Sequence, residues 1–239
     1  MKKRICALAL PLALAAGGLS LASDLKMADG HILPLGNEIT LREADKSYVG
    51  KELQKEWNRE KVEKEILPAV KRMGLFGKGD ALHEKMMAKQ LGQLFEATRF
   101  SQLQMETKEA FHQAVVMSVK LEEKDIAGWN EIIRAMEKAH PGKIDILGEN
   151  RTLNLETIRE SMKKEDGHDR FVYKKDGQTE FIYGSIFLFA EQYGVETPFY
   201  VFFIAAADKG QFGVTAIYTN QATGRIMEPV LVKGAEGLR

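Results

Sequence analysis

The longest apolar stretches of the chain lie toward its C-terminal end, at residues 181–190 and 199–207. Side chains alternate between the two faces of a β-strand, and in both stretches the odd and the even positions are largely apolar. A sheet with one solvated face would carry polar residues at alternate positions. The pattern therefore predicts two central strands that are covered on both faces.

Shorter strands are predicted around these two. Asp176-Gly177, between two alternating segments, is typical of a β-hairpin turn, and residues 212–218 continue the sheet. Thirteen of the twenty aromatic residues lie within residues 170–219, which places most of the sheet there. A further strand is expected near residues 111–121, paired as a hairpin with 98–105.

Helices are predicted where apolar positions recur three or four residues apart. Residues 50–73 combine one apolar stripe with a face of interleaved Lys and Glu. Pro68 should kink or split this helix because it lacks an N–H group, and Gly74 should end it. Asp80 is a suitable N-cap for a second helix. The side chains of that helix expected to point inward are Leu82, Met86, Leu91, Leu94 and Phe95.

Two more helices are predicted at residues 126–139 and at 155–164, the latter capped by Asn154. The segment 225–232 is open to two interpretations. It reads either as an edge strand, where Pro229 would be tolerated, or as a short helix.

Helices followed by a meander of strands are typical of an α+β fold. We expect one domain over residues 23–239, in which an antiparallel sheet packs against about four helices. The sheet is expected mainly within residues 170–219, with a further strand near 111–121. Two short extended segments, at 31–33 and 38–41, precede the helices.

The start of the chain has the three-part layout of a secretory signal peptide. Residues 2–4 are basic, residues 5–16 are an apolar run, and small residues end at Ala22, just before Ser23. The apolar run barely reaches the roughly 20 residues that a bilayer requires, and it contains a proline. The sequence therefore predicts cleavage between Ala22 and Ser23, no transmembrane segment afterwards, and a periplasmic or extracellular protein.

The only cysteine, Cys6, lies within the predicted signal peptide. The mature chain would therefore be cysteine-free, with no disulfide, thiol nucleophile or cysteine-based metal site. The whole chain carries 34 basic and 34 acidic residues, and loss of the three basic residues of the signal leaves a small acidic excess. Because a nucleic-acid-binding protein would be expected to show a basic excess, no nucleic-acid partner is predicted.

Metal-binding motifs are incomplete. His83-Glu84 begins the zinc-helix pattern H-E-x-x-H, but Met87 stands where the second histidine is needed. The densest group of possible ligands lacks the spacing of a calcium loop and is expected to be a solvated loop. It consists of Glu165, Asp166, His168 and Asp169. No metal and no cofactor is predicted.

Serine motifs are incomplete as well. Ser161 and Lys164 match the S-x-x-K nucleophile motif, but at the end of a predicted helix and without the accompanying S-D-N and K-T-G sequences. Ser185 follows Gly184 but lacks the downstream glycine of a nucleophile elbow. The sequence therefore assigns no catalytic residue, although carboxylates that are distant along the chain can still meet in space.

Small residues among the aromatics of the two apolar segments are the remaining candidates. Close approach of a helix is their simpler explanation. The functional hypothesis is that they keep open an apolar pocket, or form a dimer patch, over this part of the sheet. They are Gly184, Ser185, Ala205 and Ala206.

Three functional interpretations follow. The favoured one is a non-enzymatic exported domain that binds an apolar ligand or a partner through its aromatic-rich sheet. The second is a cell-envelope hydrolase whose site is assembled from distant residues. The third is a structural or assembly factor of the envelope that works through the charged helix at residues 50–73.

Overall fold

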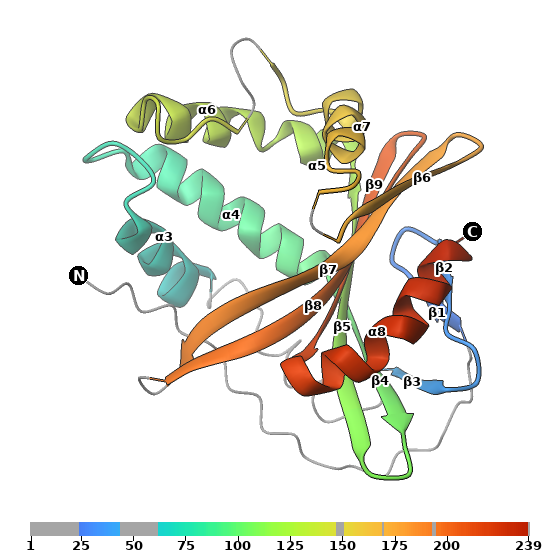
Figure 1. The fold of residues 1–239 in the computed structure, drawn as a ribbon. Coiled ribbons are helices and arrows are strands. Elements are labelled where there is room, and N and C mark those ends of the chain that lie inside the picture. The colour runs from blue at the N-terminus through green and yellow to red at the C-terminus, as the bar shows by residue number, and fades with distance from the viewer. Residues whose placement is uncertain (1–23, 44–61, 147–150, 169, 193–194, 239) are drawn as a thin grey trace.

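The computed structural model describes residues 24–43, 62–146, 151–168, 170–192 and 195–238 (Figure 1). The predicted signal peptide, with its cleavage site at Ala22 and Ser23, lies outside these residues. So does most of the first half of the helix predicted at 50–73.

Seven antiparallel strands of the described residues form the main sheet, in the spatial order β3-β4-β5-β9-β8-β7-β6. Their bounds are β3 Ile39–Glu43, β4 Arg99–Glu106, β5 Phe111–Glu122, β6 Val172–Asp176, β7 Thr179–Gln192, β8 Val195–Asp208 and β9 Gln211–Asn220. A separate two-stranded ribbon pairs β1 Asp24–Lys26 with β2 Ile32–Pro34. The predicted α+β fold with an antiparallel sheet is confirmed.

The strand predictions at the C-terminal end hold in detail. Asp176 pairs with Thr179 across the hairpin turn, where Gly177 has a φ of 59°, the left-handed conformation that such turns require. β8 lies between β7 and β9 and pairs with both along most of its length. The hairpin expected from residues 98–105 and 111–121 is formed by β4 and β5.

The helical segments lie between and after these strands. They are the π-helix η2 Val62–Ile66, α3 Leu67–Met73, α4 Ala81–Ala97, α5 Glu123–Ala127, α6 Asn130–Ala139, α7 Leu155–Lys164 and α8 Gln221–Glu236. Gly74 ends α3 with a φ of 61°, as predicted. The Asp80 carboxylate accepts a hydrogen bond from the backbone N–H of His83 and so caps α4. Pro68 lies in the first turn of α3, where a helix needs no N–H donor.

Two helix predictions require correction. Leu82 does not point inward, because its side chain is 63 % exposed. The segment 126–139 is not one helix, because α5 ends and α6 begins on either side of Gly128 and Trp129. Gly128 lies so close to Gln90 of α4 that a Cβ atom there would overlap its side-chain amide. A side chain at position 128 would therefore require the Gln90 side chain to shift.

The C-terminal segment is a helix, α8, and it is longer than the predicted 225–232. Asn220 caps it by accepting a hydrogen bond from the N–H of Thr223 at 2.9 Å. Its buried side chains lie on one face, whereas Pro229 is exposed on the other. Burial of each large apolar side chain of this helix stabilises the fold by about 1.5–3 kcal/mol. This gain offsets the free-energy cost of the hydrogen bond that a proline inside a helix removes.

The two faces of the sheet are covered by different helices (Figure 1). On one face, Phe181 of β7, Phe202 of β8 and Ile217 of β9 pack against Met227 and Leu231 of α8 and form the main core. The β1–β2 ribbon closes the side of this core. We call this side of the sheet the α8 face.

On the opposite face, which we call the α7 face, Ile182 of β7 and Ala205 and Ala207 of β8 pack with Met162 of α7. The coverage of this face is incomplete, since Leu188 near the end of β7 is 50 % exposed. The prediction that the two long strands are covered on both faces therefore holds over the part near α7 and fails toward the end of β7.

A third, smaller apolar cluster lies among the helices that precede β4 and follow β5. It is formed by Val70 of α3, Phe76, and Ile132 of α6, with side chains of α4 packed around them. Within the described segments, we find no helix that combines the length and the apolar character needed to cross a bilayer.

Candidate functional site

A partly open cavity of about 430 Å³ lies between α7 and the α7 face of the sheet. This volume is within the range of about 300–1,000 Å³ that is usual for ligand sites. Its floor consists of Ile182, Phe203, Ala205 and Phe212, and its roof includes Ile158 and Met162 of α7. Phe171, Leu153 and Ile146 complete the apolar part of the lining.

Ala205 is the residue that leaves room in the floor. It pairs with Ile182 on β7 and stands on the same face of β8 as Phe203. A methyl group fills much less space than the aromatic rings of Phe203 and Phe212, so the floor is lowest at Ala205, which packs with Met162 at the inner end of the cavity. The cavity opens to the surface beside Ile146 and Arg151, both of which are about half exposed.

The polar groups of the cavity lie along α7 and the segment before it. They are Arg151, Thr157, Ser161 and Glu165. Arg151 Nη1 lies 3.5 Å from Glu160 Oε2, and both side chains are about half exposed. The lining therefore carries charges of both signs, and its one cation already has a carboxylate partner. This arrangement favours an uncharged ligand over an ionic one.

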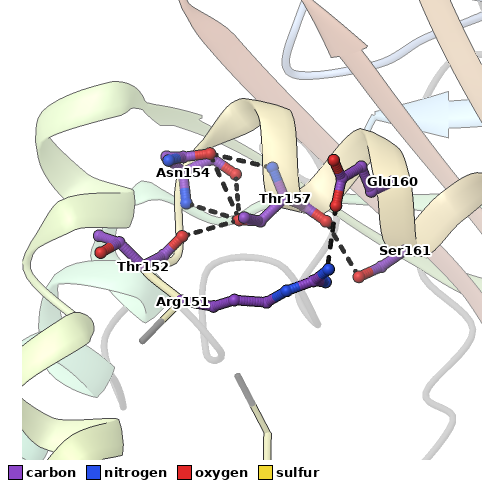
Figure 2. Close-up of polar contacts among 6 residues, drawn as sticks. All are labelled: Arg151, Thr152, Asn154, Thr157, Glu160 and Ser161. Carbon is purple, nitrogen blue, oxygen red and sulfur yellow. Dashed lines mark hydrogen bonds and ion pairs between the residues drawn. The ribbon is translucent and has the colours of Figure 1, made fainter. Parts of the chain in front are cut away.

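Hydrogen bonds at the N-terminus of α7 fix the roof of the cavity, as Figure 2 shows. Asn154 Oδ1 accepts from the N–H of Thr157 at 2.9 Å, and Thr157 Oγ1 accepts from the N–H of Asn154 at 3.0 Å. Thr157 Oγ1 also donates to the carbonyl of Thr152. This reciprocal capping box defines where α7 begins and holds Thr157 at the cavity.

Two longer-range contacts attach α7 and its leading segment to the rest of the fold. The side-chain amide of Asn130 in α6 bonds to both the N–H and the carbonyl of Leu153, at 2.6 and 3.0 Å. Arg159 Nη2 donates to the carbonyl of Asp208 at the end of β8, at 2.9 Å. The walls of the cavity are therefore held by the fold itself, as expected of a pre-formed binding site.

A buried carboxylate lies on the other side of α7 from the cavity. The Glu180 side chain is 6 % exposed, and its oxygens lie 3.4 Å from Lys163 Nζ and 3.7 Å from Lys175 Nζ. Burial, together with the neighbouring Glu180, raises the pKa of Tyr173 to about 12. Two lysines compensate the buried charge, so we interpret this cluster as a connection between α7 and the β6–β7 hairpin.

The structure divides the four small residues that the sequence grouped together, and Gly184 and Ser185 both line a second cleft away from α7. Ala205 alone lines the cavity under α7, while Ala206 points into the main core on the α8 face. The space beside Gly184 is filled by Phe171 and the carbonyl of Arg170. Ser185 lies on the α8 face and donates a hydrogen bond to Glu228. The sequence could not reveal this division, because it depends on which helix covers each face.

The other motifs take part in local structure. Ser161 Oγ donates to the carbonyl of Thr157 within α7, and His83 Nδ1 lies 2.8 and 2.7 Å from the two Asp80 oxygens at the start of α4. Asp166 accepts a hydrogen bond from the N–H of Tyr173, while Asp169 lies outside the described residues. No group of three or more potential metal ligands occurs in the part of the chain that the structure describes.

Comparison of the chain with models of protein families, with curated proteins and with solved structures found no match in any of the three.

Proposed function

We propose that this protein is a non-enzymatic, exported binding protein that takes up a small, uncharged apolar ligand in the cavity under α7. The observation that carries the proposal is the cavity of about 430 Å³ under α7. In its floor, Ala205 is a small side chain among the larger side chains of Ile182, Phe203 and Phe212. Empty apolar space forfeits van der Waals contacts on its lining. A ligand that fills this space would recover them.

The chemical class of the ligand follows from the lining. Its apolar residues come from four separate elements, α7 and strands β7, β8 and β9, together with Phe171, Leu153 and Ile146. The Thr157 and Ser161 hydroxyls are engaged with backbone carbonyls, and Arg151 is paired with Glu160. A hydrocarbon or an alkyl alcohol of about the length of decanol meets these conditions better than a sugar, a nucleotide or a metal ion.

Ala205→Trp should abolish uptake of such a ligand, because the indole ring would occupy the cavity. The probe is N-phenylnaphthylamine, whose fluorescence rises in apolar surroundings, with decanol as the competing ligand. We expect saturable binding of the probe to the unmodified protein and an affinity at least tenfold weaker in the variant. A tenfold loss corresponds to about 1.4 kcal/mol of binding free energy.

Lys209→Trp provides the matched control. It places the same side chain at an exposed position of the β8–β9 turn and should leave probe binding unchanged. Circular dichroism would establish that both variants are folded. Unchanged probe binding in folded Ala205→Trp would place the apolar site elsewhere, and absence of binding to the unmodified protein would refute the proposed function.

The export component of the proposal rests on the signal-like pattern at the start of the chain. Intact-mass measurement of protein recovered from the periplasm or medium of a bacterial host tests it. The mass should correspond to a chain beginning at Ser23, and a mass that retains Met1 to Ala22 would contradict cleavage there.

A further inference from the structure

A second cleft, of about 410 Å³, lies on the opposite side of the sheet from the α7 cavity. It opens where β6 begins and α8 crosses β7. Its apolar walls are Val172, Tyr183, Phe202 and Val232. Its polar groups are Arg170, Ser185 and Glu228, which are brought together from three segments far apart in the sequence.

The charged pair in this cleft is only partly engaged. Arg170 Nη1 donates to both Glu228 oxygens, at 3.0 and 3.2 Å, and lies 3.5 Å from Ser185 Oγ. Among the described residues, the hydrogen bonds of Arg170 all run through Nη1, and the edge formed by Nε and Nη2 makes none with these residues. That edge is the part of a guanidinium group that binds a carboxylate through two parallel hydrogen bonds.

The guanidinium group is nevertheless held in place. It lies 5.2 Å from the centre of the Phe187 ring, within the range of a cation–π contact. The Ser185 hydroxyl, which is 4 % exposed as a residue, donates to Glu228 at 2.6 Å and fixes the carboxylate from the other side. One cation and one anion are therefore presented side by side, each with unused hydrogen-bonding capacity.

A buried hydroxyl group lies near Ser185 and Glu228, behind the lining of the cleft. Tyr200 is 0 % exposed, and within the described residues its hydroxyl has no hydrogen-bond partner of good geometry. Burial and the nearby negative charge of Glu228 raise the pKa of Tyr200, so the hydroxyl remains protonated and able to donate or accept. The protonated hydroxyl adds no charge beside the Arg170–Glu228 pair.

We propose that this cleft binds a zwitterion with an apolar side chain, of the kind formed by a free α-amino acid such as leucine. The ligand carboxylate would accept hydrogen bonds from Nε and Nη2 of Arg170, and its ammonium group would donate to Glu228. Its side chain would lie against Val172 and Val232, which are the more exposed apolar residues of the cleft. The Arg170–Glu228 pair need not open, because the ligand uses the atoms that the pair leaves free.

Isothermal titration calorimetry with three probes of similar shape tests this proposal. The probes are L-leucine, isocaproate, which lacks the ammonium group, and isoamylamine, which lacks the carboxylate. We expect L-leucine to bind with an affinity at least tenfold higher than that of either single-charge probe. Equal affinities for all three, or no heat from L-leucine at millimolar concentration, would overturn the proposal.

Substitutions then locate the site. Glu228→Gln and Arg170→Gln keep most of the side-chain volume and should each weaken L-leucine binding at least tenfold. Arg225→Gln removes one positive charge from an exposed position of the same helix and should leave binding unchanged. Ala205→Trp should also leave it unchanged, which separates this site from the α7 cavity. Undiminished L-leucine binding in folded Glu228→Gln and Arg170→Gln would overturn the assignment to this cleft.

Discussion

Ala206→Leu is expected to lower the free energy of unfolding by about 3 kcal/mol, whereas Ala205→Leu should change it by less than about 1 kcal/mol. The two alanines are adjacent on β8, and each is 2 % exposed. Ala206 belongs to the filled core beneath α8, where added methyl groups must displace neighbours. Ala205 borders the cavity under α7, where a leucine side chain has room.

Urea denaturation of the two variants beside the unmodified protein measures this difference. The pair is matched in residue type, strand and exposure, so general effects of the substitution cancel. Similar losses in both variants would mean that the space under α7 is not available to a side chain, and the cavity would then carry no functional argument.

Gly224→Ala should destabilise the protein by about 3 kcal/mol or more, against the usual preference for alanine in helices. A Cβ atom at this position in α8 would overlap the Cβ and ring atoms of Tyr200. Tyr200 cannot yield easily, because it is fully buried and its ring packs edge-on against Phe187 at 5.7 Å. The first turns of α8 would therefore have to move away from β8.

The matched control is Gly77→Ala, because a Cβ atom there would have no neighbour within 4 Å. Its effect on the denaturation midpoint should be small. If Gly224→Ala stabilised the protein by about 1 kcal/mol, as alanine does in an exposed helix, the close packing of α8 on Tyr200 would be wrong.

Local patterns predicted those elements of this fold whose signals are contained in the sequence nearby. The hairpin at Asp176-Gly177, the caps at Asp80 and Asn154, and the end of α3 at Gly74 each depend on a few neighbouring residues. All four are confirmed. The long strands were predicted as well, but their cover on both faces holds only near α7, since Leu188 toward the end of β7 is 50 % exposed.

Features that depend on distant residues were not predicted. Apolar residues lie at the odd positions of β5, yet the even positions are the more buried ones and include Ser118. Ser118 is buried because its hydroxyl bonds to Thr215 on β9 and accepts from the N–H of Ala28, at 2.7 and 2.8 Å. No local periodicity contains that information.

The candidate site was predicted only in part, for the same reason. Ala205 was identified as a small residue among aromatics, but α7, which forms the roof, lies more than forty residues earlier in the chain. The cleft at Glu228 was missed because Pro229 made a strand as plausible as a helix there. Met227, Leu231 and Ala235, spaced four apart and fully buried, are the signal that would have identified α8.

The central claim, that the cavity under α7 takes up an apolar ligand, can be tested most directly at Met162. Its side chain lines the cavity and is 5 % exposed, so isotope labelling of methionine methyl groups provides an NMR reporter inside the site. During titration with decanol, the Met162 signal, assigned by substitution to leucine, should shift saturably. The signals of Met227, buried on the other face, and of Met73, on the surface, should remain in place. An unmoved Met162 signal, or equal shifts at all three methionines, would contradict the claim.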